Sequence, residues 1–343
     1  MVRRTHTWLI IALIFASVGM ILLSLIVGTE SISIPRAWAE WRSGLPPAQA
    51  PTLGILVQQR LPRTLAALIV GSGLALAGCA FQAMLRNPLA EPYTLGVASA
   101  GAFGAWTATV LIAGYGLRAS VLGIPSIQLF AFVFAEIDIL IVYLLAARRE
   151  RISPSVLLLG GITMGMLCNG GIMFMRYFAD PERVVMMDRW LMGGVDVLGY
   201  APVEKLFIGV LPCTLILLAQ APKFDQLGFG TEIAAGRGVN VRMLQVITFL
   251  IGSLMTAVVV SVVGTIGFVG LIVPHAVRSV TGSRHRLLMP MSILVGAGFL
   301  CFCDILARKI LPGETPIGIV TTLIGGPFFL YLLMRRRFTD WEA

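Results

Sequence analysis

The stretch QRLPRTLAALIVGSGLALAGCAFQAMLRNPLAEPYTLGVASAGA, residues 59–102, decides the fold of this chain. Residues 61–81 form an apolar run of about twenty residues, the length that crosses the hydrocarbon core of a bilayer. A second such run covers residues 95–113. Between the two runs, Pro88 and Pro92 with Asn87 interrupt any helix. The stretch therefore predicts two transmembrane helices separated by a firm break.

The same pattern repeats along the whole chain. Of its 343 residues, 57% are hydrophobic and only 13% are charged, which excludes a soluble globular protein with a hydrated surface. We predict an all-α, polytopic transmembrane helical bundle that forms a single domain over residues 1–343. About ten spans are expected, near residues 8–28, 61–81, 95–113, 127–147, 155–175, 204–220, 243–263, 267–281, 289–307 and 317–334.

The charges indicate how the chain is oriented. The formal net charge is +9, but the basic residues lie at the ends of apolar runs, which favours membrane orientation over nucleic-acid binding. Basic clusters at Arg148, Arg149 and Arg151 and at Arg335–Arg337 fall on one side when ten spans are counted. Because cytoplasmic loops carry an excess of lysine and arginine, we expect both termini to be cytoplasmic.

Small residues recur at helical spacing. Gly96, Ala100 and Gly104 form one ladder, and Gly161 with Gly165 forms another. Small side chains let transmembrane helices approach closely, so both ladders predict helix–helix contacts.

The sequence contains no phosphate-binding loop, no metal-ligand cluster and no nucleophile–base pair. We therefore expect no enzyme, no catalytic residue, no metal site and no cofactor bound by this chain. An energy source such as ATP would have to act through a partner on a polar loop. The longest of the loops expected on the cytoplasmic side runs from Ala221 to Arg242, and within it residues 230–239 can form a short helix closed by glycine.

Four blocks resemble a known family, the permease subunits of ABC importers for iron–siderophore complexes, heme and cobalamin. The blocks are residues 59–102, GTEIAAGRGV at 230–239, GFVGLIVPHAVRSVTGSRHRLLMPMS at 267–292 and CDILARKILPGETPIGIVTTLIGGPFFLYLL at 303–333. With the matching order of spans, the resemblance covers essentially the whole chain. Three positions depart from the family pattern: Arg237 and Thr315 stand where leucine is usual, and Arg284 where an acidic residue is common.

The resemblance implies a homodimer of ten-helix permeases in a bacterial inner membrane. Two ATPase subunits, which bind ATP and Mg, would lie on the cytoplasmic side, and a substrate-binding protein on the periplasmic side. The cargo would be an iron(III)–siderophore or a related chelate such as heme or cobalamin, moved inward by alternating access. Iron–siderophore is chosen because it is the most prevalent cargo of the family.

The resemblance also implies two partner surfaces. Arg60, Arg63 and Arg308 would form an exposed basic rim that faces acidic residues of the binding protein; the alternative is that Arg60 and Arg63 are interfacial anchors. The 230–239 loop would be the helix that couples to the ATPase, and the alternative is a solvated connector. The coupling residues would be Gly230, Thr231, Glu232, Ala234, Ala235, Gly238 and Val239.

Ser153, Pro154 and Ser155 open the fifth span, where permeases of the family narrow the pathway as an inner gate. An ordinary helix start explains the same residues equally well, because serine caps helices and proline suits a first turn. Met164 offers a flexible lining for a bulky ligand, or it takes part in helix packing.

Glu136 and Asp138 lie near the middle of the fourth span, where a carboxylate is costly and often functional. Being two residues apart, they point to different faces of a helix. They are either protonated and hydrogen-bonded between helices, or one of them meets water in the pathway. A proton relay through them defines the rival function, a proton-coupled secondary transporter.

Overall fold

The computed structural model describes residues 2–28, 32–44, 46, 49–116, 118–121, 123–147, 153–197, 199–309 and 315–335, and most of these residues are helical. In chain order the elements are α1 (Val2–Ile26), α2 (Ile34–Arg42), α3 (Pro51–Ile55), the π-helical turn η1 (Leu56–Arg60), α4 (Leu61–Leu85), the 3₁₀ turn η2 (Pro92–Leu95), α5 (Val97–Tyr115), β1 (Ser120–Val121), β2 (Ile124–Pro125), α6 (Ser126–Ala146), α7 (Pro154–Phe178), α8 (Pro181–Leu191), α9 (Ala201–Ala219), α10 (Ala221–Leu227), α11 (Thr231–Gly236), α12 (Val241–Val263), α13 (Val269–Thr281), α14 (His285–Lys309) and α15 (Ile317–Arg335).

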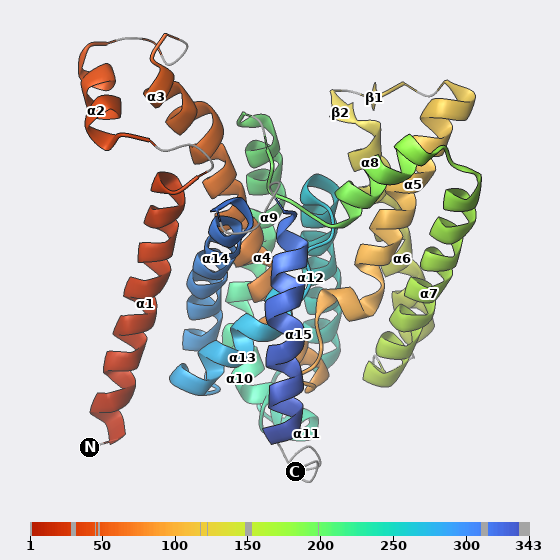
Figure 1. The fold of residues 1–343 in the computed structure, drawn as a ribbon. Helices are drawn as coiled ribbons and strands as arrows, with labels where there is room; N and C mark the ends of the chain where they lie inside the picture. Colours follow the sequence, from red (N-terminus) through yellow and green to blue (C-terminus); the bar gives the residue numbers. More distant parts are fainter. Residues whose placement is uncertain are drawn as a thin grey trace.

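The prediction of about ten spans is confirmed. Within the described residues, eight helices are long and apolar enough to cross a membrane, and two shorter apolar helices, Val269–Thr281 and Ile317–Leu332, complete the set. The longest span runs without interruption through α3, η1 and α4, from Pro51 to Leu85. The start of α1 and the end of α15 lie at the same end of the bundle, as an even number of spans requires (Figure 1).

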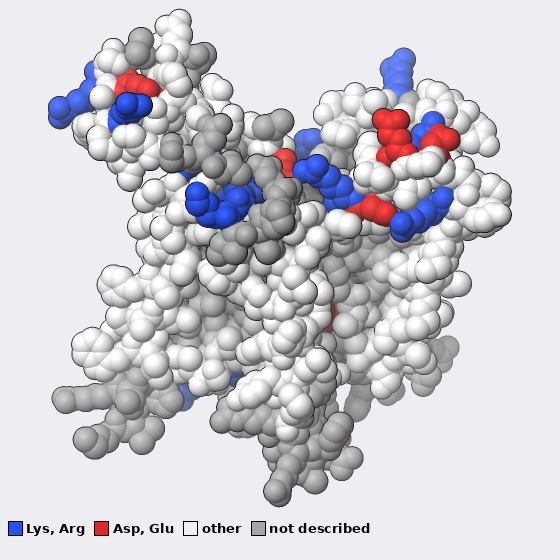
Figure 2. Space-filling view, viewed as in Figure 1, with Lys and Arg blue, Asp and Glu red and all other residues white. Residues whose placement is uncertain are grey.

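The two ends of the bundle differ. We call the end that carries α2, α3, α8 and the small β1–β2 hairpin the α8 end, and the opposite one, with α10 and α11, the α11 end (Figure 1). Figure 2 shows basic and acidic side chains gathered at the α8 end, above a broad belt that is almost uncharged. Such a belt is what a protein shows to lipid. Arg148, Arg149, Arg151, Arg336 and Arg337, which support the predicted orientation, lie outside the described residues.

Helix α4 forms the centre of the bundle, because most of its side chains are buried against its neighbours α9, α12, α13 and α14. Glycines allow its closest contacts. A Cβ atom placed on Gly78 would lie 1.9 Å from the carbonyl oxygen of Gly270 in α13, and one on Gly71 would lie 2.3 Å from that of Gly296 in α14. Only hydrogen fits at either position, so α13 and α14 approach the α4 backbone directly.

Helices α5, α6 and α7 pack beside this centre, and the predicted glycine contacts are confirmed there. A Cβ atom on Gly104 would lie 2.3 Å from the carbonyl oxygen of Phe130 in α6, and one on Gly161 would lie 2.5 Å from the Cα atom of Leu95. Helix α1 lies at the edge of the bundle, and its exposed side chains include Trp8, Phe15 and Leu22.

Two spans are followed by breaks in which the α-helix is interrupted. The first break separates α4 from α5 and begins at Arg86, which has a φ of 49°. The second separates α12 from α13 and ends at Phe268, which has a φ of 68°. Residues other than glycine rarely adopt positive φ, so tertiary contacts must hold both breaks in place. The prolines predict the first break, and the predicted spans 243–263 and 267–281 already separate at the second, but the sequence does not predict the positive φ of Phe268.

Candidate functional site

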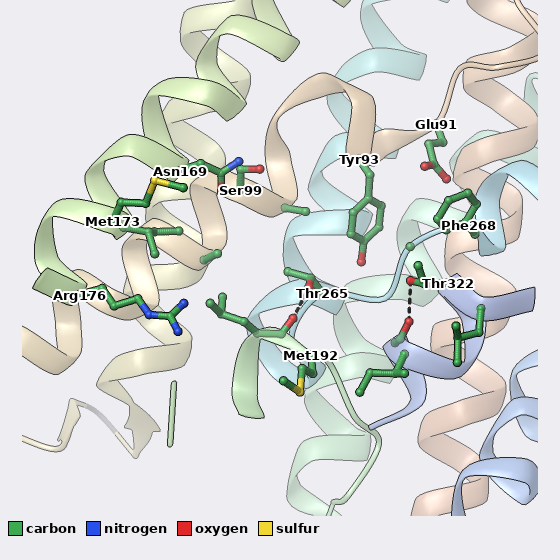
Figure 3. Close-up of a pocket in the computed structure, with 18 residues that line it drawn as sticks. Glu91, Tyr93, Ser99, Asn169, Met173, Arg176, Met192, Thr265, Phe268 and Thr322 are labelled. Atoms are coloured by element: carbon green, nitrogen blue, oxygen red, sulfur yellow. Dashed lines mark hydrogen bonds between the residues drawn. The ribbon is translucent and has the colours of Figure 1, made fainter. Parts of the chain in front are cut away.

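A pocket of about 840 Å³ opens where the two breaks meet helices α7 and α15 (Figure 3). Asn169, Met173 and Arg176 extend from α7 on one side, and Glu91 and Phe268 lie on the other, with Tyr93 and Thr265 between them (Figure 3). Helix α15 contributes Gly318, Ile319, Thr322 and Leu323. The lining is mostly apolar with a few polar groups, which is typical of a site that admits a large ligand.

Hydrogen bonds connect the two breaks directly. The carboxylate of Glu91 accepts from the backbone N–H of Thr94, which closes a capping box at η2, and from the backbone N–H of Phe268. The hydroxyl of Tyr93 accepts from the backbone N–H of Ile266. These bonds satisfy backbone groups that the interrupted helices leave without helical partners. The first break therefore positions the second.

Further bonds extend this connection. The Thr265 hydroxyl donates to the carbonyl oxygen of Leu191 at the end of α8, and the side-chain amide of Gln82 donates to the Gly270 carbonyl at 3.2 Å. These bonds connect α8 to the second break, and α4 to the start of α13, which follows that break.

Glu91 is the most perturbed acid outside the spans. It is 8% exposed, and its Oε2 has no hydrogen-bond partner among the described residues. Burial raises the pKa of this carboxyl to about 7, against a smaller opposing effect of the hydrogen bond from Phe268. Glu91 therefore changes charge near neutral pH while it contacts both breaks.

The arginines predicted to dock a binding protein cluster at the α8 end, but they are not an exposed rim. Arg60 and Arg308 are 4% and 7% exposed. Arg60 donates to the carbonyl oxygens of Leu25 and Ile26 at the C-terminus of α1. A cation at that end of a helix is stabilising. The expected exposure is thus wrong for these two side chains, because they close helix ends and satisfy a buried charge.

That buried charge is Asp304, which is 0% exposed and lies between two arginines. Its carboxylate pairs with Arg63 at 2.9 Å and with Arg308 at 2.6 Å. Arg63 also pairs at 2.7 Å with Asp196, which is 42% exposed and connects the cluster to the surface. Arg308 donates in addition to the hydroxyl of Ser24, at 3.1 Å. The docking role of these arginines stays a prediction.

The 230–239 loop folds into the predicted short helix closed by glycine. Helix α11 ends in a Schellman motif, in which the N–H of Val239 bonds to the Ala234 carbonyl and that of Gly238 to the Ala235 carbonyl. Gly230 and Gly238 have φ values of 118° and 83°, which glycine alone adopts without strain. Ala234 is buried, whereas Glu232, Ala235 and Gly236 are exposed at the α11 end, and Thr231 is partly exposed.

The residues predicted as an inner gate start a helix. The Ser153 hydroxyl caps α7 by accepting from the Val156 N–H at 3.4 Å, Pro154 is the first helical residue, and Ser155 follows it. Met164 is partly buried against the main core and does not line the pocket, whereas Met173 does. The gate role stays a prediction, while the helix start is observed.

Glu136 and Asp138 point to different faces of α6, as predicted. Asp138 is 1% exposed. A Cβ atom placed on Gly96, at the start of α5, would lie 3.1 and 3.2 Å from its two carboxylate oxygens. Neither oxygen has a hydrogen-bond partner among the described residues. Glu136 is less buried and lies on the side of Cys213 in α9. Neither carboxylate lines the central pocket.

Sequence reasoning missed the main lining residues of the pocket, namely the polar Glu91, Asn169 and Arg176 and the apolar Phe268. Glu91 lies within residues 59–102, and an acidic residue in a break between two spans is a pattern that could have indicated a pocket residue. No comparable signal marks Phe268, because its positive φ is a property of the folded chain alone.

Comparison with known proteins agrees with this geometry. The model of the FecCD transport family matches residues 12–335, nearly the whole chain. The hemin transport system permease protein HmuU of Yersinia pestis is 36% identical over 282 residues, covering 81% of this chain and 82% of its own. The vitamin B12 import system permease protein BtuC of Klebsiella pneumoniae is 34% identical over 336 residues, covering 98% and 96%.

A solved structure agrees with these relatives. A transporter of the metal-chelate ABC type, in an inward-facing conformation, matches with a TM-score of 0.82 and 30% identity, covering 96% of this chain and all of the other. The fold, the site and the comparisons define a multi-pass membrane permease. The chain belongs to the FecCD transport family.

Proposed function

We propose that this chain is the permease subunit of a binding-protein-dependent ABC importer that moves an iron(III)–siderophore, or a related chelate such as heme or cobalamin, into the cytoplasm. The observation that carries the proposal is the central pocket, of about 840 Å³, bounded by two interrupted spans. Interrupted helices at membrane depth are typical of transporter sites, because their free backbone groups line a cavity. Relatives named for hemin, Fe(3+)-citrate and vitamin B12 support a bulky metal-containing cargo.

The pocket also supports a dimer. It lies between α7 and α15, and both helices expose large apolar side chains, among them Met166 and Leu167 on α7 and Leu323 and Leu330 on α15. A second copy facing these helices would close one pathway between two such pockets. We propose a homodimer with this pathway on its axis.

The partners follow from the two ends. The α11 end would face the cytoplasm and two ATPase subunits that hold ATP and Mg, with α11 as the coupling helix. The α8 end, with the cluster around Asp304, would face the substrate-binding protein in the periplasm. We propose a bacterial inner membrane as the setting of this arrangement. Closure of the ATPase dimer would press on α10 and α12 and change which side of the pocket is open.

Copurification tests this proposal. The protein is extracted from its native membrane in mild detergent, and the proteins and any ligand that accompany it are identified. We expect an ABC ATPase and a binding protein loaded with a chelate. Recovery of neither, together with uptake that follows a proton gradient, would contradict the importer and favour a secondary transporter built on Glu136 and Asp138.

A further inference from the structure

A second pocket, of about 490 Å³, lies at the α11 end between α10 and the start of α14. Helix α10 contacts both α14 and α11, so the pocket lies close to α11. The lining residues are Pro222, Asp225, Gln226, Gly228, Phe229, Ser283, Arg284, His285 and Arg286. The pocket is separate from the central one and shares no residue with it.

The pocket has a fixed wall. Asp225 accepts from the backbone N–H of His285 at 2.5 Å and contacts the Nδ1 of its ring at 3.1 Å, so it caps α14. His285 is 8% exposed and packs beside Phe224, with a ring separation of 5.7 Å. The one carboxylate of the pocket is therefore already engaged by the protein itself.

The two arginines of the pocket are exposed and uncommitted. Within the part of the chain that the structure describes, neither Arg284 nor Arg286 has a side-chain hydrogen bond or an ion pair. With Asp225 held by His285, the open face of the pocket carries an excess of positive charge. An arginine guanidinium is suited to a bidentate bond with a carboxylate.

The coupling helix is attached to this same pocket. Arg237, which ends α11, donates to the side-chain oxygen of Gln226 at 2.6 Å and lies 5.1 Å from the ring centre of Phe229. Both partners of Arg237 line the pocket. Two of the positions that depart from the family pattern, Arg237 and Arg284, thus meet at one place in the fold. An occupant of the pocket would therefore contact Gln226 and Phe229, the two residues that hold the Arg237 side chain.

We propose that this pocket is a basic socket that receives an acidic side chain of the partner ATPase, so that Arg284 and Arg286 select the ATPase that couples to this permease. The inference rests on the proposed function and adds a second contact beside α11. Charge complementarity of this kind chooses between partners and raises their association rate. An ATPase with a neutral or basic residue at that position would associate poorly.

The test measures association with the ATPase that copurifies with the protein. The full-length permease is placed in nanodiscs of neutral phosphatidylcholine, and the dissociation constant is measured at 50 and 300 mM NaCl. The variant is Arg284→Glu with Arg286→Glu. The matched control is Arg118→Glu, an exposed arginine at the opposite end. A Lys replacement of both arginines keeps the charge, and Arg284→Gln serves if the double variant does not fold.

We expect the double Glu variant to bind at least tenfold more weakly than the wild type at 50 mM salt, with a smaller difference at 300 mM. The Lys variant and Arg118→Glu are expected to stay within a few fold of the wild type. Equal binding by the double Glu variant and the Arg118→Glu control would overturn the inference. The same measurement in discs that contain anionic phosphatidylglycerol gives a second check, because a weakening seen only there would also overturn it. If the wild type itself binds no ATPase, the proposed function fails instead.

Discussion

At the scale of single residues, Glu91 is the carboxylate that contacts both breaks and lines the central pocket. Its carboxylate contacts η2 and the first residue before α13, and it lines the central pocket. Ionising a carboxyl group that is buried in this way costs free energy, because the charged form loses its hydration. Glu91 nevertheless lies between the two breaks and is hydrogen-bonded to both. Its protonation state should therefore affect how firmly the two breaks are held together.

The pH dependence of stability tests this role of Glu91. Its pKa is about 7 in the folded protein and 4.5 in the absence of burial. Between these values the unfolded chain has released the proton while the folded chain retains it, so stability falls as pH rises. The loss is on the order of 3 kcal/mol across the window and ends above pH 7.

We expect the melting temperature in detergent to decrease from pH 4.5 to 7 in the wild type. Glu91→Gln should flatten this profile, while Glu182→Gln, which changes an exposed acid on α8, should leave it as it is. A profile that stays equally steep in Glu91→Gln would show that another group titrates.

The arginine cluster gives a second prediction at this scale. Arg308 lies 2.6 Å from the fully buried carboxylate of Asp304, so Arg308→Glu replaces this partner by a like charge and should destabilise the protein by about 3–5 kcal/mol. If these arginines also dock the substrate-binding protein, the folded Arg60→Glu and Arg308→Glu proteins should bind it more weakly than the wild type does. The difference should be larger at low salt than at high salt. Thermal melts and association constants, measured on the same samples, separate the two effects. Unchanged association by the folded variants would remove the docking role.

At the scale of elements, the close approach of α4 to α13 depends on glycine. Gly78→Ala would place a Cβ 1.9 Å from the Gly270 carbonyl oxygen, so the helices must separate, at a cost of about 1–3 kcal/mol or more. Gly19→Ala is the matched control, because nothing lies within 4 Å of that Cβ position on α1. We expect a lower melting temperature for Gly78→Ala alone. Equal melting temperatures would mean that the backbone contact is looser than described.

The sequence predicts these elements unevenly, for physical reasons. Length and apolarity are enough to find the spans, and Pro88 and Pro92 are enough to place the first break. Helix α11 is predictable because its glycines determine its end. The second break falls between the predicted spans 243–263 and 267–281, but the bonds that hold it come from Tyr93 and Glu91, which lie more than 170 residues away in the chain, so no local pattern indicates those bonds.

Helices α2 and α8 are too short and too polar to register as spans, and the β1–β2 hairpin has only two residues in each strand. The resemblance indicated where docking arginines should lie, but exposure depends on their neighbours. Asp304 and the end of α1 decide that Arg60 and Arg308 are buried.

At the scale of the whole molecule, the two ends and the central pocket form one connected path. The α11 end carries α11, the proposed coupling helix, and the proposed basic socket, and the α8 end carries the charge cluster (Figures 1 and 2). Between them the pocket is bounded by breaks that hydrogen bonds join to α4 and α8.

Uptake into proteoliposomes tests the central claim most directly. The permease is reconstituted with its copurifying ATPase, and the loaded binding protein is supplied on the side opposite the ATPase. We predict that the chelate accumulates only with ATP, Mg and the binding protein, that Glu136→Gln and Asp138→Asn do not abolish uptake, and that an imposed proton gradient changes nothing. Uptake driven by the gradient without ATP, and lost in those two variants, would contradict the account.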